Sequence, residues 1–179
     1  VIGMEFASFF CSLGVKVTVI EMMDEILGGV DKELSALLRA EYAKKGIKFL
    51  LSTKVVGLSK GEEGITVSYE NAEGAGSVTA EKLLMSVGRR PVMKGLGLEN
   101  LNLELTERKC IKVDEHLQSS VPGVYVCGDL NGVSLLAHTA VREAEVAVHH
   151  IIGKEDRMSY QAIPGVVYTN PEIASVGMS

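Results

Sequence analysis

Aromatic side chains are scarce in this sequence, which has five Tyr, four Phe and no Trp among its 179 residues. A strong charge of one sign is also missing, because 18 Lys and Arg stand against 23 Asp and Glu, a formal net charge of −5. Nucleic-acid binding needs either a basic stripe or a platform of stacking aromatic rings. Neither can be assembled here, so the composition argues against a nucleic-acid-binding protein.

Long apolar runs and paired cysteines are missing as well. No apolar stretch reaches the roughly 18 residues that a membrane-spanning helix requires. The three cysteines, Cys11, Cys110 and Cys127, lie far apart, and no two of them have CxxC or metal-finger spacing. The sequence therefore predicts neither a disulfide scaffold nor a metal site, and it favours a reduced, cytoplasmic protein.

The remaining composition, 46% apolar and 23% charged, is that of an ordinary globular protein. Its first residue is Val1, and a helical pattern begins almost at once, with no strand before it. Strand-like segments near the other end stop without further structure. We therefore expect the chain to be part of a longer protein, incomplete at both ends.

The first 51 residues alternate between helical and strand patterns. An apolar helical stripe at 4–13 ends at Gly14, a residue suited to a left-handed helix cap, and the β-branched run at 15–21 follows it. Asp31 can cap a second helix, and a second strand is expected at 47–51. This rhythm predicts an α/β fold with parallel strands. The side chains expected to face the core are Met4, Ala7, Phe10, Cys11 and Leu13, then Leu34, Leu37, Leu38 and Tyr42.

Residues 55–80 change to a strand pattern interrupted by Gly- and Glu-rich turns at 61–64 and 73–76, which predicts an antiparallel β-meander. The other expected elements are a buried strand at 82–87, a short strand at 111–113, an apolar strand at 123–129, a helix at 135–152 and strands at 166–168 and 173–177.

Gly3 and Glu21 have the spacing of a nucleotide-binding unit. Such a unit needs a glycine turn, a helix whose N-terminus faces a pyrophosphate, and an acid about 20 residues further on. Glu21 follows Gly3 by 18 residues, and its carboxylate would accept ribose hydroxyls and repel a 2′-phosphate, which favours NAD over NADP. The alternative is structural: close helix packing at Gly3 and a solvated acid at Glu21.

Asp129 ends an apolar segment, where ligands of open α/β sheets bind. The next helix begins near 135–138, and its free N–H groups could face an electron-rich part of a ligand. The alternative here is a capping aspartate beside a helix that only packs on the core. His138 stands at this helix start, where a lone histidine is more often structural than a ligand or base.

Six stretches, in this order along the chain, resemble the pyridine nucleotide–disulfide oxidoreductase family: 1–7 (VIGMEFA), 17–21 (VTVIE), 87–91 (VGRRP), 124–129 (VYVCGD), 135–138 (LLAH) and 168–172 (YTNPE). The resemblance implies a Rossmann-like FAD/NAD(P)-binding α/β fold with an antiparallel β-meander insertion. Three features are most similar to the branch that oxidises dihydrolipoyl groups: Glu21, where NADPH-using relatives carry a basic residue, the VGRRP run at 87–91, and the LAH stretch at 136–138.

In that branch a dithiol reduces a redox disulfide, electrons pass to FAD, and FAD passes a hydride to NAD⁺. The implied partners are a second subunit in a homodimer and the lipoyl domains of 2-oxoacid dehydrogenase or glycine cleavage complexes. The redox CxxxxC and the catalytic His–Glu pair have no counterpart here, so no catalytic residue is expected in this chain. The alternatives are a mercuric reductase or soluble transhydrogenase, or a non-catalytic NAD-binding module.

The resemblance also implies which residues bind the cofactors. For NAD they are Val1, Ile2, Gly3, Met4, Glu5, Glu21, Val55 and Gly88; for FAD they are Asp129, Leu135, Leu136, Ala137 and His138. It divides the chain into an NAD-binding domain at 1–87, a returning flavin-domain segment at 88–159 and the start of a dimerisation domain at 160–179.

Overall fold

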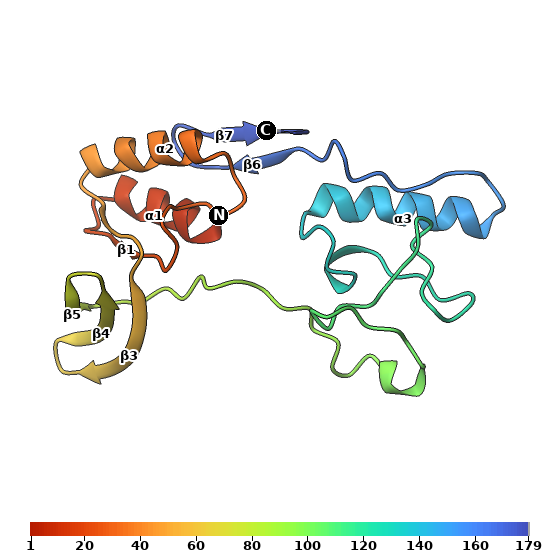
Figure 1. Ribbon diagram of the computed structural model, residues 1–179, viewed down its shortest axis with the longest axis horizontal. Coiled ribbons are helices and arrows are strands. Elements are labelled where there is room, and N and C mark those ends of the chain that lie inside the picture. Colours follow the sequence, from red (N-terminus) through yellow and green to blue (C-terminus); the bar gives the residue numbers. More distant parts are fainter. Residues whose placement is uncertain (179) are drawn as a thin grey trace. The chain divides into compact units, whose positions relative to one another are not determined.

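A computed structural model describes residues 1–178, which form two compact units (Figure 1). The first unit combines Val1–Val87 with the chain from Pro164 onward, and the second is Gly88–Ile163. Ser179, the last residue of the segment expected at 160–179, lies outside the described residues. No helix within residues 1–178 has both the length and the apolar character that crossing a membrane requires.

The first unit begins with helix, strand, helix and strand in turn: α1 (Ile2–Ser12), β1 (Thr18–Ile20), α2 (Lys32–Lys44) and β2 (Lys48–Leu50). The two strands pair in parallel, with Val19 opposite Phe49. Parallel strands need a crossover connection, and here α2 provides it. The α/β class expected from the sequence is confirmed.

Local signals set the ends of both helices. Gly14 follows α1 with a φ of +79°, a left-handed conformation that glycine adopts without steric cost. The Asp31 carboxylate accepts hydrogen bonds from the backbone N–H groups of Glu33 at 2.9 Å and Leu34 at 3.3 Å. These contacts satisfy N–H groups that have no partner inside the helix. Both predicted caps are confirmed.

The core faces of these helices were predicted only in part. Phe10 and Leu13 of the first helix and Leu34 and Leu37 of the second are exposed, whereas the polar Ser8 and Ser35 are buried. The Tyr42 hydroxyl explains part of this difference, since it is buried and contacts Ser8 Oγ at 2.5 Å. A buried hydroxyl must find a polar partner, which draws polar atoms into the core. The residues that do pack together there are Met4, Ala7, Ile26, Leu27, Leu38, Tyr42, Ile47, Val167 and Ile173.

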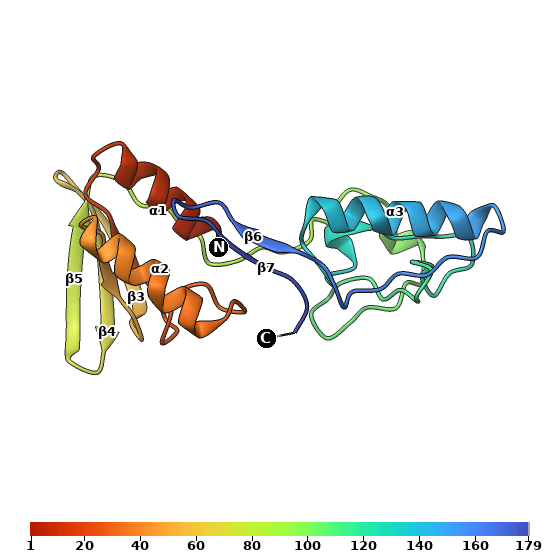
Figure 2. The same cartoon turned by 90° about the horizontal axis from the view of Figure 1, so that it is seen from above.

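The last two strands complete this core. The two strands expected here are present as β6 (Gly165–Val167) and β7 (Ile173–Ser175), and they pair antiparallel with Val167 opposite Ile173. Figure 2 shows β6 passing near the start of α1, where the Glu5 carboxylate accepts the Tyr168 N–H at 3.0 Å. Segments from the two ends of the sequence therefore belong to one folded unit.

The predicted meander is present as β3 (Lys54–Gly61), β4 (Gly64–Asn71) and β5 (Gly74–Ala80), paired antiparallel in the order β3-β4-β5. The turn expected at 61–64 is confirmed, but the second turn lies at residues 72–73 rather than 73–76. Asn71 Oδ1 accepts the Glu73 N–H at 2.9 Å and closes the turn early. Gly74, with a φ of +118°, then begins the next strand.

The buried strand expected at 82–87 is not formed. The segment has no regular secondary structure and is exposed, and Val87 has 89% of its surface accessible. A strand requires a neighbour that completes its hydrogen bonds, and no strand described in residues 1–178 pairs with this segment.

The second unit is built around α3 (Ala137–Ile151), with the short 3-10 helices η1 (Leu98–Asn100) and η2 (Gly128–Leu130) and long loops. The strands expected at 111–113 and 123–129 are reduced to isolated bridges, among them Gln118 with Tyr125. At Gly128 the φ of +74° turns the chain away from an extended path. Leu117, Val146 and Ala147 form the core between the loops and the helix.

Candidate functional site

The start of α1 is held close to the segment at 82–87. A Cβ atom built on Gly3 would lie 3.2 Å from Cβ of Ser86, so glycine permits the close approach. The N-cap residue Val1 offers no side-chain acceptor, and its carbonyl accepts the N–H groups of Met4 and Glu5. Close packing therefore explains why a glycine stands at position 3. The N-cap side chain accepts no hydrogen bond from the first backbone N–H groups of α1.

Glu21 stands at the carboxyl end of β1, where ligands of parallel sheets bind. Its backbone N–H donates to Leu50 O and its carbonyl accepts the Thr53 N–H, each at 2.9 Å. One carboxylate oxygen, Oε1, accepts the Met23 N–H at 2.9 Å, whereas no donor within residues 1–178 reaches Oε2. The structure thus presents one anchored, partly exposed acceptor at this edge.

The other candidates for the nucleotide are spread over the chain. Glu5 is engaged with the Tyr168 N–H, as described above. Val55 is 44% exposed on β3, beside a β-bulge between Val55 and Gly57. Gly88 begins the second unit with a φ of +119°, a conformation that residues with a side chain rarely adopt.

The five flavin candidates do come together within the second unit. Asp129 lies in η2 with its side chain exposed, and residues 135–138 are exposed where α3 begins. A Cβ on Gly128 would lie 3.3 Å from Cβ of Ala140, so η2 rests directly on the first turns of α3. The N-cap residue Leu136 makes no side-chain cap. An acceptor and an uncapped helix start are therefore neighbours.

Asn131, in the same turn, was not singled out from the sequence. It is 2% exposed, and its Oδ1 accepts the Val133 N–H at 2.9 Å. Its Nδ2 is buried without a partner in the described structure, although an unsatisfied buried donor costs free energy.

Glu143 was also missed. Its side chain is completely buried beneath η2, where one carboxylate oxygen accepts the Gly128 N–H at 2.5 Å and the other accepts the Tyr160 hydroxyl at 2.8 Å. Burial, and then the neighbouring Glu143, raises the pKa of Tyr160 and of the Cys127 thiol. Glu143 shares the inward face of α3 with Thr139, Val146 and Ala147, and this helical spacing was the available signal.

The three cysteines are free thiols in the structure. Cys110 is buried, which the sequence did not indicate, and its side chain fills the space where a Cβ on Gly132 would stand. The raised pKa of Cys127 keeps it a thiol, the unreactive form.

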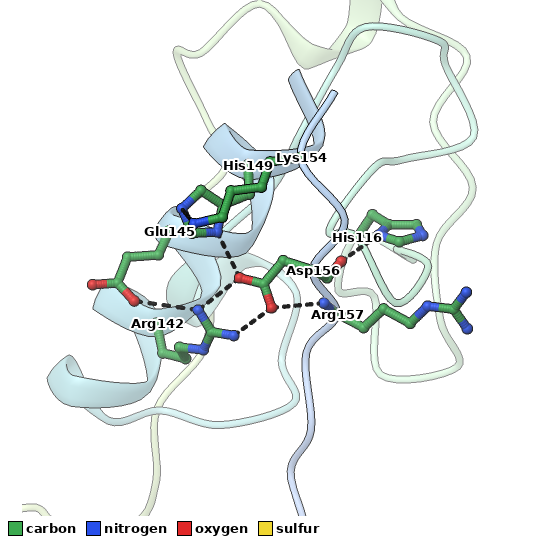
Figure 3. Close-up of polar contacts among 7 residues, drawn as sticks. All are labelled: His116, Arg142, Glu145, His149, Lys154, Asp156 and Arg157. Atoms are coloured by element: carbon green, nitrogen blue, oxygen red, sulfur yellow. Dashed lines mark hydrogen bonds and ion pairs between the residues drawn. The ribbon is translucent and has the colours of Figure 1, made fainter. Parts of the chain in front are cut away.

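A polar network fastens the segment after α3 to the helix (Figure 3). The Asp156 carboxylate accepts two hydrogen bonds from Arg142, at 2.6 and 2.8 Å, and lies 2.6 Å from Nδ1 of His149. Arg142, and then His149, hold the pKa of Asp156 well below its usual range. His149 and the adjacent His150 point to different partners, since His150 contacts the Tyr125 hydroxyl at 2.8 Å.

We predict that Asp156→Asn lowers the melting temperature at pH 7, and that this difference shrinks progressively as the pH falls from about 4 to about 2. A carboxylate with a depressed pKa stabilises the fold above its unfolded pKa of about 4, and this contribution is lost as the pH falls toward the folded pKa. Thermal melts of both proteins across this range measure the difference. The control is Glu145→Gln, which removes only a 3.3 Å exposed contact with Arg142. A deficit for Asp156→Asn that does not shrink between pH 7 and pH 2 would contradict the assignment.

Comparison with known proteins identifies the family of this chain. Residues 1–144 match the family described as pyridine nucleotide-disulphide oxidoreductase. The chain is 42% identical to a dihydrolipoyl dehydrogenase of Thermus scotoductus over 180 residues, and 40% identical to the human mitochondrial dihydrolipoyl dehydrogenase over 183 residues. These matches include 99% and 100% of this chain but 39% and 36% of those proteins.

Solved structures show the same fold. The crystal structure of LpdA from Mycobacterium tuberculosis superposes with a TM-score of 0.88 at 28% identity, over 97% of this chain and 37% of that one. The HOCl-induced flavoprotein disulfide reductase RclA from Escherichia coli gives a TM-score of 0.87 at 26% identity, over 99% of this chain and 40% of that one. The Rossmann-like class expected from the sequence is confirmed.

Proposed function

Because the chain belongs to the pyridine nucleotide-disulphide oxidoreductase family, we propose that it carries the nucleotide site and part of the flavin site of a dihydrolipoyl dehydrogenase. The observation that carries the proposal is the identity of about 40% with dihydrolipoyl dehydrogenases along the whole chain. When bound, FAD would supply the electron transfer between a redox disulfide and NAD⁺.

The flavin candidates fit a group with hydroxyls and an electron-rich ring. The exposed Asp129 carboxylate can accept hydrogen bonds from ribityl hydroxyls. The start of α3, at Leu135, Leu136, Ala137 and His138, has no side-chain cap from Leu136. This helix start places backbone N–H groups and the positive end of the helix dipole where negative charge on the ring would be stabilised. Asn131 Nδ2 adds a buried donor without a partner in residues 1–178.

The nucleotide candidates fit a dinucleotide in the same way. The uncapped start of α1 suits a pyrophosphate, and Gly3 lets this helix end stay close to its neighbouring segment. The Glu21 carboxylate keeps one oxygen for ribose hydroxyls and would repel a 2′-phosphate. We propose NAD rather than NADP on this basis, with Val1–Glu5, Val55 and Gly88 as further contacts.

The domain identities belong to the same proposal. Residues 1–87 would be the NAD-binding domain, 88–159 the returning flavin segment, and 160–179 the start of the dimerisation domain. The partners would be a second subunit and the lipoyl domains of 2-oxoacid dehydrogenase or glycine cleavage complexes. We propose a cytoplasmic enzyme, although the names of several relatives place those proteins in mitochondria.

Flavin binding by the full gene product tests the proposal. We expect the purified protein to carry FAD and Asp129→Ala to weaken FAD binding about tenfold, the loss expected of a hydrogen bond to a charged group. Glu99→Ala, at an exposed acid in η1, is the control and should leave the affinity unchanged. NAD binding without any flavin would favour a non-catalytic nucleotide-binding module instead.

A further inference from the structure

Glu143 is an unusual residue to find buried in the second unit. Its side chain has no accessible surface, and its two hydrogen-bond partners, the Gly128 N–H and the Tyr160 hydroxyl, are both uncharged. An apolar side chain of similar size would avoid the cost of removing a carboxyl group from water. The stability of α3 alone therefore does not explain why a glutamate occupies this position.

The atom that Glu143 holds is the backbone N–H at the start of η2. Gly128 is the pivot of this turn, because the chain changes there from the extended Cys127 to a φ of +74°. The turn is pinned on one side by the Glu143 carboxylate and on the other by the close approach of Gly128 to Ala140. The next residue along the chain is Asp129, whose side chain is exposed.

Tyr160 holds the Glu143 carboxylate in place. Its hydroxyl donates to Glu143 Oε1 at 2.8 Å, which leaves the other oxygen directed at Gly128. Tyr160 comes from the segment after α3, so two separate parts of the chain meet at one carboxylate beneath the turn. Burial beside Glu143 raises the pKa of this hydroxyl, which keeps it protonated and able to donate.

We infer that Glu143 is a positioning residue for the flavin site: by holding the Gly128 N–H, it sets the orientation of Asp129 relative to the start of α3. Glu143 itself is buried and would not touch the cofactor. The inference rests on the proposed function, because it assigns the turn and the helix start to FAD.

FAD affinity and thermal stability of the full gene product separate a positioning role from a purely structural one. Glu143→Met fills the same space but leaves the Gly128 N–H buried without an acceptor, and we expect FAD to bind about tenfold more weakly. Glu143→Gln can still accept the Gly128 N–H and donate to the Tyr160 oxygen, so it should restore affinity to within about threefold of the unchanged protein. Tyr160→Phe, which keeps the Gly128 contact, should have a smaller effect than Glu143→Met.

Glu143→Asp and Asp129→Ala distinguish a failure of the inference from a failure of the proposed flavin site. If Glu143→Met does not fold, Glu143→Asp keeps the carboxylate but withdraws it from Gly128, and it should weaken FAD binding in the same direction. A folded Met or Asp variant that binds FAD as tightly as the unchanged protein, while Asp129→Ala binds weakly, overturns the inference and leaves the proposed function intact. Normal FAD binding by Asp129→Ala overturns the proposed flavin site and the inference with it.

Discussion

Replacing Gly64 by Ala is expected to destabilise the β-meander by about 2 kcal/mol more than the same replacement at Gly74. The two glycines are closely matched, because each is the first residue of a strand after a two-residue turn. Each also has a positive φ, +130° at Gly64 and +118° at Gly74, so alanine suffers similar backbone strain of about 1–3 kcal/mol at either site.

The difference comes from what a Cβ atom would meet. At Gly64 it would collide with the carbonyl oxygen of Ala80, and it would lie 2.9 Å from the carbonyl carbon of Ala80 and 3.1 Å from Cα of Glu81. These are backbone atoms at the end of β5, which cannot move without breaking the ladder. At Gly74 no atom lies within 4 Å of the built Cβ. The clash at Gly64 is therefore added to the strain.

Amide hydrogen exchange in β4 measures the result, because it reports the free energy of opening for a single element. Exchange from Val67, the buried residue of this strand, should become faster in Gly64→Ala than in Gly74→Ala. Equal protection in both variants would show that β5 can shift aside, and that the close approach at Gly64 contributes nothing.

Glu21→Arg should lower the preference of the full gene product for NADH over NADPH by about 100-fold in kcat/KM. The carboxylate acceptor for the ribose hydroxyls is lost, and the guanidinium attracts a 2′-phosphate that Glu21 would repel; a charged hydrogen bond contributes about 1.5–3 kcal/mol. Steady-state kinetics with both nucleotides give the ratio. The NADH preference of Glu21→Gln should lie between those of the unchanged protein and Glu21→Arg, since glutamine can still accept the Met23 N–H but carries no negative charge.

Asp24→Arg is the control for this change. It alters the net charge by the same amount on the same loop, but Asp24 pairs with Lys32 at 2.9 Å and does not end the strand. Its nucleotide preference should therefore stay close to that of the unchanged protein. Equal shifts of the NADH-to-NADPH ratio of kcat/KM in Glu21→Arg and Asp24→Arg would show that the net charge of the loop controls the preference. Glu21 would then be only a solvated acid at the end of a strand.

Much of the local structure was predictable because it depends on neighbouring residues. Gly14 ends α1 and Asp31 begins α2 through the steric freedom of glycine and the short reach of a capping carboxylate. The meander was predictable for the same reason, since its strands are joined by tight turns. The segment at 82–87 shows the limit: its apolar sequence predicts a buried strand, but strand formation depends on a partner elsewhere.

The residues of the candidate site also fall into two groups, those predicted from the sequence and those found only in the structure. Glu21 and Asp129 were identified from the sequence because each acid directly follows an apolar segment that ends at a predictable position. Ser86 against Gly3, the unsatisfied Asn131 amide and the buried Glu143 were not, because nothing near them in the sequence marks their partners. Gly128 and Glu143 are 15 residues apart, and only the packing of η2 on α3 brings them together.

The family, the α/β class, the helix caps and the β-meander could be predicted from the amino-acid sequence, because they follow from short-range spacing and backbone preference. Tertiary packing selected the remaining core residues of both helices, as when Ser8 and Ser35 replace Phe10 and Leu37 in the core. It also decided that Glu143 lies beneath the Gly128 turn. Burial depends on contacts between residues distant in the chain, and these contacts form only when the elements pack against one another.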